Sequence, residues 1–245
     1  HEMHKRLHGI LSDVVCESHG LDGFHRADEY AAKIREVIGD DLEAVCRRVE
    51  KEQNIPVIPV QSEGFKGNKR AGYEAACNAM DRLVGTGDTR GISKYSINIL
   101  GDFNLAGEIW MIRDYFARIG VEVVANITGD GRVGDIQRAH GAALNVVQCS
   151  GATMHLADMM KDKYGIPTIR VSYFGIDDMA EALYDVADHF GDPEMIERAT
   201  TVVREELQSL LPQLEKYRRA LNGKKAAIHV GGAFKAFSLV KAFRL

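Results

Sequence analysis

The stretch SINILGDFN, residues 96–104, decides the fold class of this chain. Residues 96–100 form a short apolar run that predicts a buried β-strand, and the glycine-containing residues 101–104 predict a loop. A segment with the apolar spacing of a helix follows at 106–119 and stops at Gly120, a residue that commonly ends helices. Residues 121–127 form a second apolar run. The stretch therefore opens a strand–helix–strand unit, in which the two strands are expected to be parallel.

The same alternation continues toward the C-terminus. The sequence predicts a turn at 128–131, strands at 143–147 and 168–172, and between those strands a helix at 152–164. Strands that alternate with helices indicate a parallel sheet covered by helices on both faces. We therefore expect an α/β protein with Rossmann-like, doubly wound parallel sheet domains.

After Asp178 the pattern is helical. Asp192 and Pro193 form a favourable start for a long helix, because Asp caps the first turn and Pro fits its first position. Residues 226–230 then predict a new strand, with Gly231 and Gly232 before another helix. We therefore expect a partial N-terminal α/β domain with a linker at 1–94, a central α/β domain at 95–223, and the start of a third α/β domain at 224–245.

The N-terminal part is less regular. Residues 55–60 predict a strand, and its prolines Pro56 and Pro59 favour a position at a sheet edge. A glycine-punctuated loop follows at 61–67, and residues 68–83 predict a helix.

Composition excludes several classes of protein. The 245 residues are 45% hydrophobic and 27% charged, which is ordinary for a globular chain. A formal charge of −4 offers no attraction to nucleic acid or to an anionic membrane. No apolar run approaches the roughly 20 residues of a membrane span, and no signal segment opens the chain. We expect a cytoplasmic protein and, from the start at His1 and the end inside a predicted helix, a fragment.

The cysteines and the common catalytic motifs point to no standard site. None of the four cysteines forms a CxxC pair, so neither a zinc ribbon nor a thioredoxin-like site is indicated; they are Cys16, Cys46, Cys77 and Cys149. The sequence contains no HExxH, GxGxxG, Walker or GxSxG motif. Metalloprotease, nucleotide-binding and hydrolase functions therefore lack their usual support.

Four loops are expected at the carboxyl ends of strands, where ligands bind in parallel sheets: residues 62–67, 101–104, 149–151 and 231–235. Cys149 lies between a strand and a helix, where the helix dipole would favour a thiolate. A small buried hydrophobic residue is the commoner role for such a cysteine. Gly231 and Gly232 suit an anion or cluster cradle or simply a tight turn. Lys235 would add positive charge there, or lie on the solvated surface.

Seven sequence elements, in order along the chain, resemble the nitrogenase component 1-type family. They are Ile38-Gly39-Asp40-Asp41 with Ala44-Val45, residues 55–60 with Glu63-Gly64-Phe65-Lys66-Gly67, residues 99–104 with Gly107-Glu108, Gly129-Asp130-Gly131, residues 144–149, residues 163–167 with Phe174-Gly175, and Gly231-Gly232. The resemblance implies a partial chain of a three-domain component 1 subunit. It also implies that Cys149 ligates a metal–sulfur cofactor or its precursor, with Gly231, Gly232 and Lys235 as supporting groups.

Within this family, the sequence resembles the scaffold on which the iron–molybdenum cofactor is assembled more than it resembles the catalytic α subunit. The catalytic subunit carries an arginine two residues after the ligand cysteine, where this chain has Gly151. It also carries a glutamine and a histidine after the glycine-rich loop, and residues 67–74 lack both. A site that keeps the anchoring thiolate without those groups is expected to hold a cluster rather than reduce dinitrogen.

The resemblance further implies an iron–sulfur precursor cluster as cargo, with molybdenum and homocitrate entering in the assembled complex. The expected partners are a homologous β-like scaffold subunit in an α2β2 assembly, the nitrogenase iron protein, and cofactor donor and acceptor proteins.

Two features depart from the family pattern. No cysteine shortly precedes residues 38–41, where the family has a ligand for a second cluster, and residues 20–37 resemble the family poorly. Two alternatives therefore stay open: a catalytic component 1 α-type subunit, which would be an oxidoreductase, and a truncated, clusterless interaction module.

Overall fold

The computed structural model describes residues 43–60, 68–104, 107–148, 153–230 and 233–244, without the side chains of residues 233 and 234. The chain divides into two compact units, residues 1–61 and 62–245. In the first unit, residues 43–53 form a helix. Residues 56–60 adopt no strand, contrary to the prediction. Pro56 and Pro59 lack the N–H that a ladder requires, and no neighbouring strand is present among the described residues.

The second unit is built on a four-stranded sheet in the order β2-β1-β3-β4. Its strands are β1 (Ser96–Leu100), β2 (Glu122–Ile127), β3 (Leu144–Gln148) and β4 (Thr168–Val171). All three pairings are parallel, with Ile99 opposite Asn126 on one side and opposite Val146 on the other. Both faces of β1 and β3 are buried. The prediction of an α/β protein with a Rossmann-like parallel sheet is confirmed.

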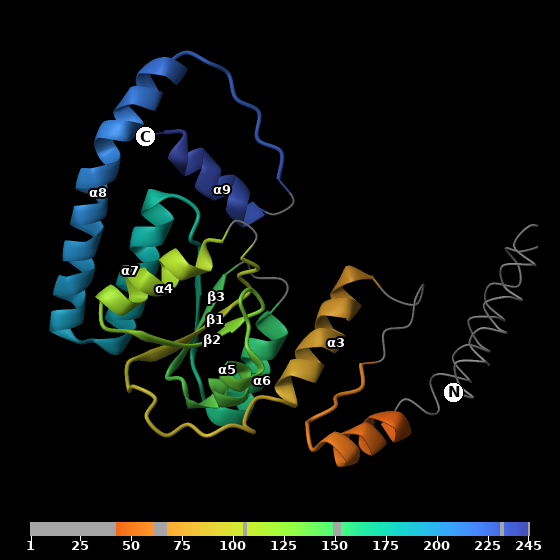
Figure 1. Cartoon of the computed structure of the whole chain (residues 1–245). Helices are drawn as coiled ribbons and strands as arrows, with labels where there is room; N and C mark the ends of the chain where they lie inside the picture. The colour runs from red at the N-terminus through yellow and green to blue at the C-terminus, as the bar shows by residue number, and fades with distance from the viewer. Residues whose placement is uncertain (1–42, 61–67, 105–106, 149–152, 231–232, 245) are drawn as a thin grey trace, which may run out of the picture. The chain divides into compact units, whose positions relative to one another are not determined.

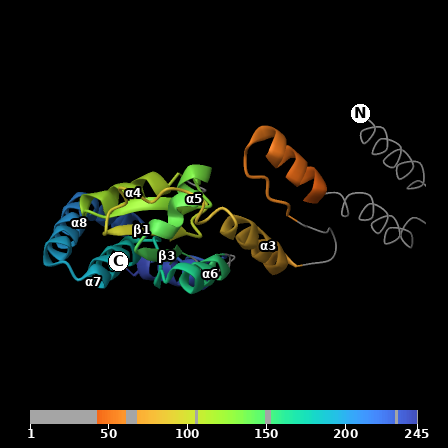
Figure 2. The same cartoon turned by 90° about the horizontal axis from the view of Figure 1, so that it is seen from below.

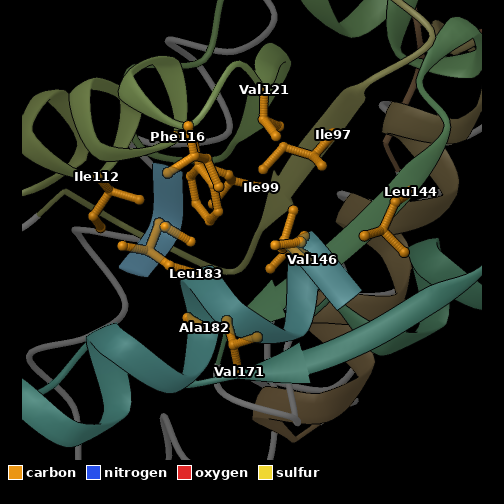
Figure 3. Packing of buried hydrophobic residues seen from close by; sticks show 14 of the residues in the cluster. Ile97, Ile99, Ile112, Phe116, Val121, Leu144, Val146, Val171, Ala182 and Leu183 are labelled. Carbon is orange, nitrogen blue, oxygen red and sulfur yellow. The ribbon is translucent and has the colours of Figure 1, made fainter. Parts of the chain in front are cut away.

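One face of the sheet is covered by α4 (Ile109–Arg118), α7 (Ile176–Phe190) and α8 (Pro193–Leu221) (Figure 1). Phe116 and Ile112 of α4 and Leu183 of α7 meet Ile99 and Val146 of the strands in one apolar core (Figure 3). These side chains are at most 3% exposed, so this core contributes the largest share of the apolar burial that stabilises the unit.

The other face is covered by α5 (Val133–Arg138) and α6 (Met154–Tyr164), and α3 (Lys69–Asp81) packs on α6 (Figure 2). Its smaller core includes Leu100 and Val147 of the strands and Leu156 of α6. Helices on both faces make the sheet doubly wound. Figures 1 and 2 show the two helical layers on either side of the strands.

The ends of the helices follow local chemistry. Asp192 caps α8 by accepting hydrogen bonds from the N–H groups of Glu194 and Met195, at 2.9 and 3.2 Å, as the Asp-Pro pair predicts. The predicted start of α4 at residue 106 is too early. Gly107 has a φ of +79°, which is not helical, so the helix begins at Ile109.

The predicted strand at 226–230 is also wrong. Residues 224–230 have no strand hydrogen bonds and are largely exposed, and they lead through the two glycines to α9 (Ala233–Ala242). An apolar run becomes a strand only beside a neighbour that accepts and donates its backbone hydrogen bonds. Within the described part of the chain, no strand lies there to pair with it. Among the described helices, none is long and apolar enough to span a membrane.

Candidate functional site

The strand order reverses between β1 and β3, since β1 leads outward to β2 and β3 leads outward to β4. In open parallel sheets such a reversal leaves a crevice at the carboxyl ends of the strands, where ligands bind. The loops that follow β1 and β3 flank this point. The fold therefore places residues 101–104 and Gln148, the last residue of β3, at the expected position of a ligand site.

Gly101 lets the chain at the end of β1 approach the ends of β2 and β3 closely. Its N–H donates to the carbonyl oxygen of Ile127 at 2.6 Å, and its φ is +90°. A Cβ added there would lie 2.3 Å from the carbonyl oxygen of Gln148 and 2.9 Å from Oγ1 of Thr153. Any side chain would collide with backbone, so glycine is required where β2 and β3 end beside β1.

The loop after β1 is fixed by its own hydrogen bonds. The Asp102 carboxylate accepts from the Asn104 N–H at 2.8 Å, and its carbonyl accepts from the Gly129 N–H at 2.8 Å. The Asn104 side chain accepts from the N–H of Ile109 at 3.2 Å. Burial raises the pKa of the Asp102 carboxyl, while the Asn104 N–H works against that rise and Glu108 adds to it. Asp102 thus stabilises a turn, a common role for an aspartate in such a loop.

Three buried polar atoms near this end of the sheet have no hydrogen-bond partner among the described residues: Oε1 of Gln148, Oγ1 of Thr153 and the hydroxyl of Tyr173. Gln148 is the last residue of β3 and Thr153 immediately precedes α6. Tyr173 is the second residue after β4. A buried polar atom without a partner is costly, so each one is suited to a ligand group that would complete it. Burial raises the pKa of the Tyr173 hydroxyl, with a smaller contribution from the charge of Asp102, so this phenol stays protonated and can donate.

The predicted site residues are only partly placed. Cys149, Gly231 and Gly232 lie outside the described residues. Lys235 is described: it is exposed on α9, with Nζ 4.6 Å from the centre of the Phe174 ring. Phe174 belongs to the loop after β4, so Lys235 lies at the same end of the sheet as the β1 and β3 loops.

Other candidates have ordinary roles. His155 contacts the amide oxygen of Asn78 at 3.0 Å on the surface between α6 and α3. Cys77 is a buried thiol whose pKa is raised by burial, so it is a poor nucleophile. Among the residues with described positions, no group of three His, Cys, Asp or Glu side chains could hold a metal ion.

The motifs assigned no role to Gln148, Thr153 or Tyr173, although Gln148 lies within the matching residues 144–149. Gln148 could have been found from strand alternation, because it occupies the same face of β3 as Leu144 and Val146, where an apolar residue is expected. Tyr173 adjoins the Phe174-Gly175 element but is not part of it. Thr153 carries no signal of its own, since a threonine before a helix usually reads as a cap.

The fold defines a Rossmann-like α/β protein whose strand order reverses between β1 and β3. The sequence matches the family of nitrogenase component 1 type oxidoreductases over residues 34–244, and the chain belongs to this family. The resemblance seen in the motifs is confirmed.

Curated relatives point to one branch of the family. The chain is 46% identical over 240 residues to the nitrogenase iron-molybdenum cofactor biosynthesis protein NifE of Clostridium pasteurianum, covering 98% of this chain and 52% of that protein. NifE of Methanosarcina barkeri is 43% identical, with 87% of this chain and 48% of that protein covered. The nitrogenase molybdenum-iron protein alpha chain of the same organism is 38% identical, over 80% of this chain and 37% of that protein.

A solved structure agrees with the fold. The structure named Nitrogenase Cp1 at pH 5 superposes with a TM-score of 0.79 at 37% identity, covering 85% of this chain and 43% of that one. The chain thus spans about half the length of the NifE relatives. Because the Clostridium pasteurianum alignment covers 98% of the chain, it takes in most of residues 20–37, where the motif resemblance is weak.

Proposed function

We propose that this chain is part of a scaffold that holds an iron–sulfur precursor while the iron–molybdenum cofactor is assembled. The supporting observation is the set of buried polar atoms of Gln148, Thr153 and Tyr173 that have no partner among the described residues, near the reversal of strand order. The relatives named as cofactor biosynthesis proteins support the same role.

In this proposal the precursor is cargo, held by the thiolate of Cys149. Cysteine thiolates are the usual protein ligands of iron–sulfur clusters. The Tyr173 and Thr153 hydroxyls would donate hydrogen bonds toward the cargo, and Gly101 would leave room for it beside the backbone. Gly231, Gly232 and Lys235 would support its negative charge.

The described groups favour holding over turnover. The Asp102 carboxylate is engaged in a turn, and the raised pKa of Tyr173 keeps its proton in place. The Tyr173 phenol is therefore not suited to accept and release protons near neutral pH. Gly151 and residues 67–74 also lack the side chains that the catalytic subunit carries at these positions.

By relation to the family, the complete protein would pair with the β-like subunit NifN in an α2β2 assembly in the cytoplasm. The iron protein and the cofactor donor and acceptor proteins would be its further partners, and molybdenum and homocitrate would enter in that complex.

The test is anaerobic iron content and electron paramagnetic resonance after addition of precursor, with the partner subunit present. We expect the precursor signal in the parent chain and its loss in Cys149→Ala. Cys46→Ala is the matched control, because Cys46 is a buried free thiol in the other unit. Equal signal in the parent and in Cys149→Ala would contradict the proposal.

A second candidate function has one observation in its favour, the 38% identity to a molybdenum-iron protein alpha chain. A catalytic α-type subunit would reduce acetylene as part of its complex with the iron protein and reductant present. Acetylene reduction would favour this alternative. A chain that binds no iron with its partner present would instead be a clusterless interaction module.

A further inference from the structure

The attachment of α9 to the central sheet is made mainly by polar groups. Asp178, in the first turn of α7, has a side chain only 7% exposed. One carboxylate oxygen accepts from the Lys241 ammonium at 2.7 Å, and the other accepts from the Ser238 hydroxyl. The hydroxyl of Ser238 also lies 3.1 Å from that of Ser172, which follows β4. The α9 anchor, as we call Asp178, Ser238 and Lys241, thus ties α9 to α7 and to the end of β4.

Apolar contact adds little to this attachment. Among the described side chains of α9, Phe237 is 69% exposed and Val240 is 39% exposed, whereas Ser238 is 3% exposed. The α9 backbone also approaches the glycine of the β4–α7 loop: a Cβ added to Gly175 would lie 3.8 Å from the Ser238 carbonyl oxygen. The position of α9 therefore depends on a buried carboxylate and its two donors.

The same helix carries Lys235, which makes no ion pair with any residue that the structure describes. Its ammonium faces the Phe174 ring at the carboxyl end of β4. Lys241, by contrast, is already paired with Asp178 and with Glu181, at 2.7 and 3.3 Å. Of these two lysines, Lys235 is the one whose charge is available to an anionic ligand at this end of the sheet.

We propose that Asp178, together with Ser238 and Lys241, is a positioning group for the cargo site. It holds α9 so that the Lys235 charge stays beside Phe174, in the loop that follows β4 at the carboxyl end of the sheet. A positive charge there favours an anionic iron–sulfur cargo. This inference rests on the proposed scaffold function and adds to it the residues that set the charge around the cargo.

The test uses the chain with its partner subunit and compares Asp178→Asn with Asp177→Asn. Asp177 is the preceding residue, exposed in the same first turn of α7, so its variant removes the same charge without touching the anchor. Hydrogen exchange of residues 233–242 reports the attachment of α9. The rate at which bound precursor is lost to a chelator, at low and high salt, reports the site.

We expect Asp178→Asn to raise exchange in α9 and to speed precursor loss severalfold, while exchange in β1 and β3 stays at the parent level. The parent should lose precursor faster at high salt, and the variant should respond less, because its Lys235 no longer faces the cargo. Ser238→Ala should act in the same direction, and Ser238→Thr should restore part of the effect. Asp177→Asn should match the parent in both measurements.

Raised exchange in α9 with unchanged precursor loss would show that the anchor is structural only and would overturn the inference. Unchanged exchange would show that α9 does not depend on Asp178. A parent chain that binds no precursor would remove the proposed function, and with it the role assigned to the anchor.

Discussion

The helices α4 and α9 are attached to the same sheet by opposite kinds of contact. Phe116 and Ile112 of α4 are 0% and 3% exposed and pack among strand and helix side chains (Figure 3). On α9, the buried side chain is the hydroxyl of Ser238, which meets the carboxylate of Asp178. Apolar burial changes little with pH or salt, whereas a charged contact depends on both. The packing of α4 is therefore expected to be insensitive to pH and salt, whereas the position of α9 is expected to depend on both.

The largest effect is expected where the apolar core is emptied. Phe116→Ala would remove a fully buried ring that also packs edge-on against Tyr173, at 6.3 Å between ring centres. We expect a loss of about 3–5 kcal/mol in the free energy of unfolding, because a cavity would remain. Urea denaturation followed by circular dichroism measures it. The matched control is Phe237→Ala on α9, where the ring is 69% exposed and the change should stay within about 0.5 kcal/mol.

If both variants lost similar stability, the contrast between the two helices would be wrong. A large loss in Phe237→Ala alone would mean that an apolar contact, rather than the anchor, holds α9.

A smaller, pH-dependent effect is expected at the anchor. Burial tends to raise the pKa of Asp178, but the hydrogen bonds from Lys241, Ser238 and Ser172 outweigh it and hold the pKa below its ordinary value. A carboxyl with a lowered folded pKa contributes stability above its unfolded pKa of about 3.9, and loses it as the pH falls through the folded value. Asp178→Asn should therefore cost about 2 kcal/mol at pH 7.

This cost should shrink as the pH falls below about 4, because Asp178 then binds a proton in the unfolded parent first and, at lower pH, in the folded parent as well. The change in this cost is measured from the urea midpoints of parent and variant, at pH 7 and at the lowest pH where both still fold. A cost that is the same at both pH values would show that the charge of Asp178 does not contribute. Asp102 offers an internal contrast, since burial raises its pKa and its charge is favoured less in the folded chain.

The sequence predicted the sheet well, because its signals are local. Each of the four strands is a short apolar run beside a loop or a helix signal, and Asp192 with Pro193 marks the start of α8. Residues 226–230 carry the same kind of run, yet they form no strand. Pairing depends on a neighbour, which a single segment does not encode.

The site was predictable only in part, for a similar reason. The motifs predict Cys149 and the two glycines as site residues, and these lie outside the described residues; Lys235 is described and lies beside Phe174. The anchor joins Asp178 to Ser238, which are 60 residues apart in the sequence. Neither residue has a distinctive sequence context, so only the folded chain brings them together.

A third prediction concerns the unpartnered Tyr173 hydroxyl. Tyr173→Phe keeps the ring against Phe116 but removes a buried hydroxyl that has no partner among the described residues. We expect the empty chain to become more stable by about 1 kcal/mol, because the cost of burying that group disappears. The same variant should retain the precursor less well. Urea denaturation without precursor and chelator-driven loss with precursor measure the two effects.

A gain in stability without precursor together with a loss in precursor retention distinguishes a ligand group from a core group. Phe116→Ala supplies the comparison, since it should weaken both stability and retention. If Tyr173→Phe lost stability without precursor, its hydroxyl would have a structural partner and would no longer support the site.

The smallest effect on stability is expected at Lys235, although its effect on the site should be clear. Its ammonium lies over the Phe174 ring at an exposed position, a contact that contributes at most about 0.5 kcal/mol. Lys235→Met should leave the urea midpoint and the exchange of α9 near the parent values, because the α9 anchor is intact. It should nevertheless speed precursor loss at low salt, and Lys235→Arg should retain the parent rate. Equal rates in Lys235→Met and the parent, with α9 still in place, would show that the anchor positions something other than this charge. If Lys235→Met loses precursor faster than the parent at low salt but not at high salt, electrostatic attraction is the contribution of α9.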